Sequence, residues 1–237
     1  GSEMCIRDSI ILGVTALITN VAIQKTTFKY EIPYMLLITA VLLVMGMTGN
    51  EITFIEGVIL WILFIAYLLY LYILAKKGND SSDEQSVKLY PVWKCLLFIV
   101  LGGVCVVIGS QFVVNGATTI ARACGMSERF IGLTIVAFGT SLPELVTSVS
   151  AARKGNAGIA IGNIVGSNIF NILFVVGTVA LICPVPFESR FVIDTVVAIL
   201  CGVLLWGGTI RHKELRKPCG VVMLLCYAAY FVYLAAM

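Results

Sequence analysis

Long apolar stretches fill most of this 237-residue chain, and they constrain its fold more than any other feature. A helix needs roughly 20 predominantly apolar residues to cross a bilayer. Only 12% of the residues are charged and 59% are hydrophobic, so the chain cannot cover a water-facing surface. We therefore predict an all-α, polytopic transmembrane helix bundle in a lipid bilayer. The predicted spans are 31–47, 54–75, 94–121, 129–152, 157–182, 191–209 and 218–236, with a shorter apolar piece at 10–18.

Composition excludes several other classes of function. The net charge is only +3 and no basic stripe with interleaved aromatic residues is present, so no nucleic-acid partner is indicated. The eight cysteines are scattered in apolar runs without C-x-x-C spacing, which is typical of small buried hydrophobes. His212 is the one histidine, which argues against a His-rich metal site or a Ser-His catalytic pair.

Two stretches of the chain repeat at a nearly constant offset. The segment 13–18 (GVTALI) matches 177–182 (GTVALI), 164 positions later, and 66–71 (AYLLYL) matches 229–234 (AYFVYL), 163 positions later. Gly57 and Gly220, each followed by valine, lie on the second offset as well. Three matches in register indicate an internal duplication.

The duplication predicts four segments with different origins. Residues 94–237 form a complete second half with five spans, and residues 10–75 are the remainder of the first half. We expect the chain to be an N-terminally truncated ten-span protein, with about seven spans and a partial one present. Residues 1–9 resemble nothing that follows and are interpreted as a non-native scar, and residues 76–93 as a polar linker.

Five spans per half is an odd number, so the second half must enter the membrane from the opposite side. This is the inverted-topology repeat found in secondary transporters. Basic residues concentrate in cytoplasmic loops, and the expected topology places twelve of them on one side. The other side carries Arg122, Arg129 and Arg190. The linker is therefore predicted to be cytoplasmic and the C-terminus to face outward.

The span 129–152 carries the one acid predicted to lie deep in the membrane. An acid at that depth costs about 2.5–3.5 kcal/mol on insertion scales and marks a functional candidate. Ala137, Thr140, Ser141 and Glu144 recur at i, i+3, i+4 and i+7, which places them on one face of a continuous helix. Pro143 removes a backbone donor and frees carbonyls in the preceding turn. These hard oxygen donors suit Na⁺ or Ca²⁺.

The next span, 157–182, carries a second polar stripe. Asn163, Ser167 and Asn171 recur every four residues. A short basic turn joins this span to the preceding one, so we predict an antiparallel hairpin over 129–182 whose polar stripes face each other. A ridge of small residues, where another helix backbone can approach closely, is predicted at Gly158, Gly162 and Gly166.

Structural explanations compete with these functional ones. Serine, threonine and asparagine in a membrane often serve only as interhelical hydrogen-bonding groups. Glu144 could be a structural acid paired with a base, but no lysine or arginine is predicted at its depth. Two other acids, Glu56 and Asp194, lie near span ends and are interpreted as interfacial or loop-facing.

The segments 139–144 (GTSLPE), 162–163 (GN) and 166–171 (GSNIFN) resemble the second α-repeat of the cation/calcium antiporter superfamily. They are most similar to its sodium/calcium exchanger-like branch. The resemblance implies a ten-helix fold of two inverted halves and coupled Na⁺/Ca²⁺ antiport by alternating access. It also implies a partner glutamate in a first α-repeat, which this sequence lacks.

The resemblance assigns roles at matching positions. Glu144 is the expected main carboxylate ligand, and hydroxyl or carbonyl oxygens complete the set. Asn171 replaces an acid found in some family members, which lowers the charge of the site. The expected remaining site residues are Thr140, Ser141, Ser167, Ala137, Asn163 and Asn171.

The sequence therefore predicts a sodium/calcium antiporter, an ion transporter that is not an enzyme and needs no cofactor beyond the transported ions. We expect it in a prokaryotic inner (plasma) membrane, and nothing in the sequence indicates an oligomeric state. The alternatives are a proton-coupled cation/Ca²⁺ antiporter with Glu144 as proton carrier, and an inert fragment. An intramembrane hydrolase with Ser141 as nucleophile is disfavoured, because no histidine or lysine lies at membrane depth to activate it.

Overall fold

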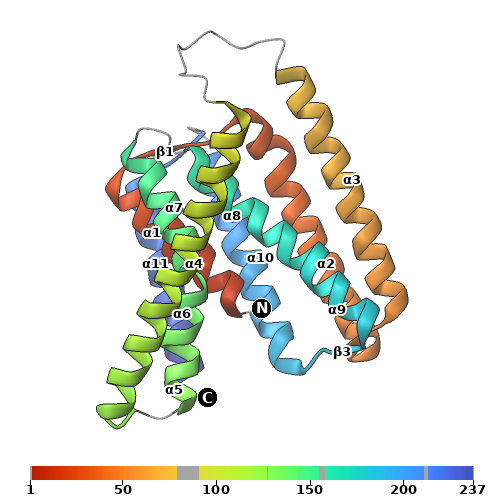
Figure 1. The fold of residues 1–237 in the computed structure, drawn as a ribbon. Coiled ribbons are helices and arrows are strands. Elements are labelled where there is room, and N and C mark those ends of the chain that lie inside the picture. The colour runs from red at the N-terminus through yellow and green to blue at the C-terminus, as the bar shows by residue number, and fades with distance from the viewer. Residues whose placement is uncertain (1, 79–90, 127, 155–157, 211–212, 237) are drawn as a thin grey trace.

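The computed structural model describes residues 2–78, 91–126, 128–154, 158–210 and 213–236 (Figure 1). The part of the linker at 79–90 lies outside them. The first half contains α1 (Ser2–Ile18), a π-helical segment η1 (Thr27–Glu31), α2 (Ile32–Gly49) and α3 (Phe54–Gly78). The second half contains α4 (Val92–Ala123), α5 (Glu128–Ile131), η2 (Gly132–Val136), α6 (Ala137–Thr140), α7 (Leu142–Arg153), α8 (Gly158–Phe170), η3 (Asn171–Val176), α9 (Gly177–Ile182), α10 (Ser189–Thr209) and α11 (Lys217–Ala236).

The helical bundle agrees with the predicted spans, with two differences. Within the described residues, five helical stretches are long and apolar enough to cross a membrane. The predicted span 129–152 is not among them, because it is broken into α5, η2, α6 and α7. The described apolar part of α11, Lys217–Val232, is shorter than the other spans. The five are Thr27–Gly49, Phe54–Lys76, Val92–Ala123, Gly158–Ile182 and Phe191–Thr209.

Two short antiparallel strand pairs join the halves and reveal their symmetry. β1 (Val21–Ala22) pairs with β4 (Glu214–Leu215), and β2 (Glu51–Ile52) pairs with β3 (Val185–Pro186). β1 and β3 begin 164 positions apart, whereas β2 and β4 begin 163 apart. Each pair therefore maps onto the other when the halves are exchanged. These offsets match those of the sequence repeats and support the predicted inverted duplication.

Glycine contacts between helices follow the same symmetry. A Cβ added to Gly57 on α3 would lie 3.0 Å from the Gly177 carbonyl oxygen of α9. A Cβ added to Gly220 on α11 would lie 3.1 Å from the Gly13 carbonyl oxygen of α1. Only a residue without a side chain allows these helices to approach so closely. The repeated glycines of the sequence are therefore the contact points between the halves.

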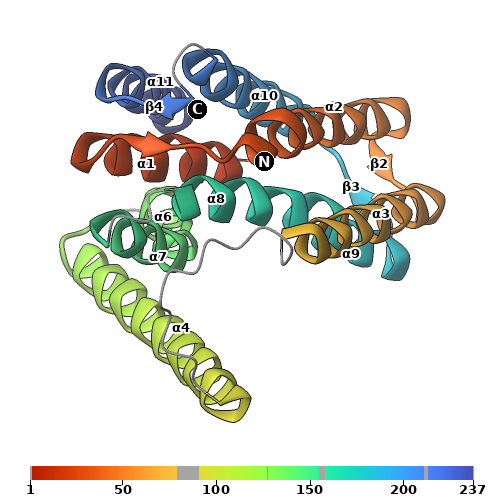
Figure 2. The same ribbon diagram turned by 90° about the horizontal axis from the view of Figure 1, so that it is seen from above.

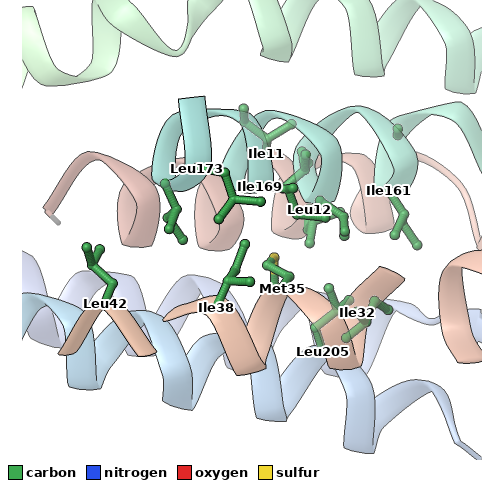
Figure 3. Close-up of a cluster of buried hydrophobic side chains, with 14 of the residues drawn as sticks. Ile11, Leu12, Ile32, Met35, Ile38, Leu42, Ile161, Ile169, Leu173 and Leu205 are labelled. Carbon is green, nitrogen blue, oxygen red and sulfur yellow. The ribbon is translucent and has the colours of Figure 1, made fainter. Parts of the chain in front are cut away.

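The core lies where α1, α2, α8 and α10 pack side by side (Figure 2). Ile11 and Leu12 of α1 belong to the same cluster of buried side chains as Ile38 of α2 and Ile169 of α8, and all four are almost fully buried (Figure 3). α4 diverges from this group, and Ala121 is its one buried residue among those described. Helix α8, the second arm of the hairpin, thus belongs to the core, whereas α4 lies at its edge.

Candidate functional site

A break in the helix at Ser141 organises the candidate site. α6 ends at Thr140, and Ser141 has φ −94° and ψ −2° before α7 begins at Leu142. Pro143 lies in the first turn of α7, where its missing N–H leaves the carbonyl of Gly139 without an i+4 donor. The helix is therefore not continuous from Ala137 to Glu144, contrary to the prediction from the sequence. Ser141, at the break, is buried, and the backbone groups freed there lie within one turn of Glu144.

α4 packs closely against α6 just before that break. A Cβ on Gly139 would lie 2.0 Å from a γ-carbon of Val114 on α4. Pro143 borders an apolar cavity of about 320 Å³ between α4 and α7. The position of the break is thus set by a glycine that admits α4 and by a proline that ends regular hydrogen bonding.

Asn163 links the two arms of the predicted hairpin. Its Nδ2 donates to the Ser148 hydroxyl of α7 at 3.4 Å and lies 3.5 Å from the Glu144 backbone oxygen. Ser148 is fully buried. Asn163 of the predicted α8 stripe therefore faces α7 at Glu144 and Ser148. Ser148 continues the stripe and was not among the predicted site residues, although its position four residues after Glu144 carries that signal.

Ser167 and Asn168 of α8 have other hydrogen-bond partners. The Ser167 hydroxyl donates to the Ile164 carbonyl at 3.0 Å, within its own helix. Asn168, which was not predicted as a site residue, is buried and places its Nδ2 3.6 Å from the Met35 sulfur of α2. Asn171 begins the π-helical segment η3. A π-helical turn interrupts the regular hydrogen bonding of a helix and occurs often at functional sites.

The structure brings together some of the predicted site residues. Glu144 and Asn163 meet across α7 and α8, and Ser141 lies one turn before Glu144. The side chains of Ala137 and Thr140 lie outside the described part of the structure. Among the described residues, no group of three or more histidine, cysteine, aspartate or glutamate side chains could hold a metal ion. The available donors near Glu144 are hydroxyl, amide and carbonyl oxygens.

The expected helix approach at the small-residue ridge is absent from the described residues. No described atom lies within 4 Å of a Cβ placed on Gly162 or Gly166. The Ala22 carbonyl oxygen lies 3.2 Å from a Cβ placed on Gly158. The close neighbour of Gly158 belongs to the strand β1 and not to a helix, so within the described part of the chain the predicted helix approach is wrong for all three glycines.

The acids near the span ends differ from each other. Glu56 accepts hydrogen bonds from the Thr53 backbone N–H at 2.7 Å and from its hydroxyl at 2.9 Å, as a loop-facing acid does at a helix start. Asp194 is buried and accepts a hydrogen bond from the Tyr230 hydroxyl. The interfacial interpretation of Asp194 is wrong, because a tyrosine of α11 satisfies it inside the bundle. The buried Glu31 was not singled out from the sequence.

The chain matches the sequence profile of the family described as "Sodium/calcium exchanger protein" over residues 9–73 and 94–236. It is 34% identical over 231 residues to a protein of Alkalimonas amylolytica named as an antiporter, CaxA, covering 93% of this chain and 72% of the relative. It is 38% identical over 142 residues to the sodium/calcium exchanger MaX1 of Methanosarcina acetivorans, covering 60% of this chain and 41% of the relative.

The fold resembles a solved transporter. The structure of the sodium-calcium exchanger NCX_Mj soaked without Na⁺ and Ca²⁺ superposes with a TM-score of 0.79 at 30% identity. The superposition covers 97% of this chain and 73% of that chain. The likeness therefore extends over nearly all of this chain.

Proposed function

We propose that residues around Glu144 carry out the exchange of Na⁺ for Ca²⁺ across a membrane. The chain belongs to the sodium/calcium exchanger family. The chain is an integral, multi-pass ion transporter and not an enzyme, as predicted. Glu144 supplies the main carboxylate to the transported ion. Ser141, Asn163, Ser167 and Asn171, with Thr140 and the Ala137 carbonyl, surround it with neutral oxygens.

One observation supports this assignment above the others. The amide of Asn163 reaches across to α7 at both Glu144 and Ser148, so the hydrophilic faces of the hairpin are held together at the depth of the acid. Ca²⁺ takes six to eight oxygen ligands and Na⁺ also prefers hard oxygen donors. A carboxylate beside hydroxyl and amide groups, next to a helix break, supplies part of such a set, and a first α-repeat would supply the rest.

The charge of the site suits competition between the two ions. α7, α8 and η3 contain one acid, Glu144, since Asn171 carries an amide. An empty charged site is costly to enclose where the dielectric constant is low. Occlusion and reorientation are therefore favoured only when Na⁺ or Ca²⁺ neutralises the carboxylate. A second carboxylate from a first α-repeat, implied by the family resemblance, would complete the charge balance.

The natural location of the chain is a prokaryotic inner (plasma) membrane. The inner membrane protein YrbG of Escherichia coli is 31% identical over 235 residues, covering 90% of this chain and 69% of the relative. We expect the ends of the spans next to Lys25, Lys76 and Lys154 to lie on the cytoplasmic side, because basic residues concentrate there. A reporter fused to the C-terminus tests this orientation, because it must report an external location.

The transport assay uses sealed vesicles that contain the protein and are loaded with Na⁺. An outward Na⁺ gradient is expected to drive uptake of radiolabelled Ca²⁺, and Glu144→Gln is expected to reduce it to background because the substitution removes the charge and keeps the shape. Glu56→Gln, at a helix start, serves as the control. Uptake unchanged by Glu144→Gln removes Glu144 from the mechanism. Uptake driven by a pH gradient without Na⁺ favours the proton-coupled alternative.

A further inference from the structure

A second acid is buried where α2 begins and α3 ends, away from the α7–α8 hairpin. Glu31 is the last residue of the π-helical segment η1, and only 9% of its surface is exposed to solvent. It lies beside a cavity of about 280 Å³ lined by Tyr30, Glu31, Tyr34, Ala66, Tyr67 and Tyr70. We call this cavity the tyrosine pocket. Its lining residues belong to the start of α2, the end of η1 and the second half of α3, and α2 begins at the end of the bundle where α3 ends (Figure 1).

The rings of the tyrosine pocket are held in a fixed arrangement. Tyr34 and Tyr67 stack with ring centroids 5.6 Å apart and an interplanar angle of 9°. Tyr67 stacks in turn on Tyr70 at 6.2 Å. The Tyr34 hydroxyl donates to the Leu63 carbonyl of α3 at 2.9 Å, which fixes the first ring. The pocket is therefore a preformed aromatic surface rather than a set of rotating side chains.

The polar groups of the pocket are incompletely satisfied. Glu31 shares a hydrogen bond with the Thr27 side chain, and no ion pair joins it to a base among the residues that the structure describes. The Tyr70 hydroxyl oxygen is buried, and no described residue hydrogen-bonds to it. A buried carboxylate without a positive partner is strongly unfavourable. Within the described part of the chain, the pocket thus combines an acid that has no ion pair with a buried hydroxyl group that has no hydrogen-bond partner.

The symmetry of the chain shows what a purely structural acid looks like at this position. Asp194 follows Glu31 by 163 positions, and Tyr230 follows Tyr67 by the same number. In the second half Tyr230 donates directly to Asp194, and both residues are buried. In the first half, Tyr67 makes no such bond to Glu31. An interfacial tyrosine belt explains the rings. It does not explain why the tyrosine–acid hydrogen bond of the second half has no counterpart between Tyr67 and Glu31.

We propose that the tyrosine pocket binds an alkylammonium cation, with Glu31 as its counter-ion. Ring faces attract poorly hydrated organic cations, and the cavity exceeds the space that a bare metal ion fills. A hard ion such as Ca²⁺ needs six or more oxygens, and this pocket offers one carboxylate and a few hydroxyls. The ammonium can come from a lipid headgroup, such as that of an ethanolamine phospholipid, or from a free amine.

The first experiment titrates the purified protein in detergent with tetramethylammonium chloride, replacing sodium chloride at constant ionic strength. Calorimetry and the thermal unfolding midpoint are followed together. We expect saturable binding that Glu31→Gln weakens at least about tenfold, since the counter-ion is lost. Tyr67→Leu weakens binding by removing a stacked ring. Asp194→Asn, the repeat equivalent, leaves the affinity unchanged.

The second experiment distinguishes the two sources of the ammonium group. The same titration is repeated in lipid nanodiscs that contain phosphatidylglycerol alone or with phosphatidylethanolamine. Competition by the ethanolamine lipid identifies a headgroup site, and its absence identifies a site for a free amine. The proposal is overturned if the wild-type protein shows no saturable tetramethylammonium binding, or if Glu31→Gln and Tyr67→Leu bind it as tightly as the wild type.

Discussion

Asn163 Nδ2 on α8 and Ser148 Oγ on α7 lie 3.4 Å apart, and this contact joins the two arms of the hairpin one turn beyond Glu144. Ser148 has no solvent exposure, so the bond forms inside the bundle. Interhelical hydrogen bonds in membranes contribute about 0.6 kcal/mol on average. The larger effect is expected to be on geometry, because the same amide reaches the backbone at Glu144.

Replacing Asn163 with alanine should separate geometry from stability. We expect the apparent Ca²⁺ affinity in transport to fall about tenfold, while the free energy of unfolding falls by only about 1 kcal/mol. Concentration-dependent Ca²⁺ uptake and thermal unfolding measure the two effects. Asn115→Ala, which removes an exposed amide from α4, is the matched control. Equal Ca²⁺ affinity in the Asn163 variant and the wild type contradicts a positioning role.

Replacing Pro143 with alanine restores a backbone donor for the Gly139 carbonyl and should straighten the chain from α6 into α7. Because proline is tolerated in the first helical turn, we expect the free energy of unfolding to change by less than about 1 kcal/mol. Transport should fall about tenfold, since the carbonyls exposed at the break return to the helix. A variant that transports at the wild-type rate would show that the break does not contribute to the site.

The glycine contacts predict matched effects in the two halves. A Cβ at Gly57 would lie 2.9 Å from the Ala180 Cβ, and one at Gly220 would lie 2.8 Å from the Ala16 Cβ. We expect Gly57→Ala and Gly220→Ala each to destabilise the protein by about 1–3 kcal/mol through overpacking. Gly102→Ala on α4, where no described atom is within 4 Å, should be neutral or stabilising. Thermal unfolding of the three variants checks the order.

The repeat also predicts a position at which a substitution by glycine should stabilise the protein. Lys213 has φ +52° and its repeat equivalent Asn50 has φ +56°. Asparagine tolerates this left-handed region and lysine is strained in it. Lys213→Gly should therefore raise the free energy of unfolding by about 0.5–1 kcal/mol, whereas Lys217→Gly in α11 should not. A lower melting temperature for Lys213→Gly would contradict this reading of the turn.

Several features of the fold could be predicted because they are written in long patterns. The apolar stretches locate the helices, the offsets of 163 and 164 locate the symmetry, and the polar residues at spacings of three and four locate the hairpin. The pairs β1–β4 and β2–β3 could not be predicted, because two residues are too short for a periodicity to appear. The break at Ser141 was signalled by Pro143, but its effect on the helical face depends on the close approach of Val114 to Gly139.

Contacts between distant residues limited the prediction of the site. The partners of Asn163 and Asn168 lie 15 and 133 positions away, so only the packed helices show which neighbour each amide meets. The same reason explains Asp194, which looked interfacial from its place near a span end but meets Tyr230 on α11. Glu31 lies at a span boundary as well, and its burial depends on the packing of α2 against α3.

Equilibrium binding of radiolabelled Ca²⁺ to the purified protein tests the role of Glu144 most directly. The account predicts saturable binding that Na⁺ displaces, that Glu144→Gln weakens at least about tenfold through loss of its charge, and that Glu144→Asp weakens less because the carboxylate is kept. Glu56→Gln should bind as the wild type does. Na⁺-sensitive Ca²⁺ binding of equal affinity in the wild type and Glu144→Gln would contradict the central claim that this carboxylate holds the transported ion.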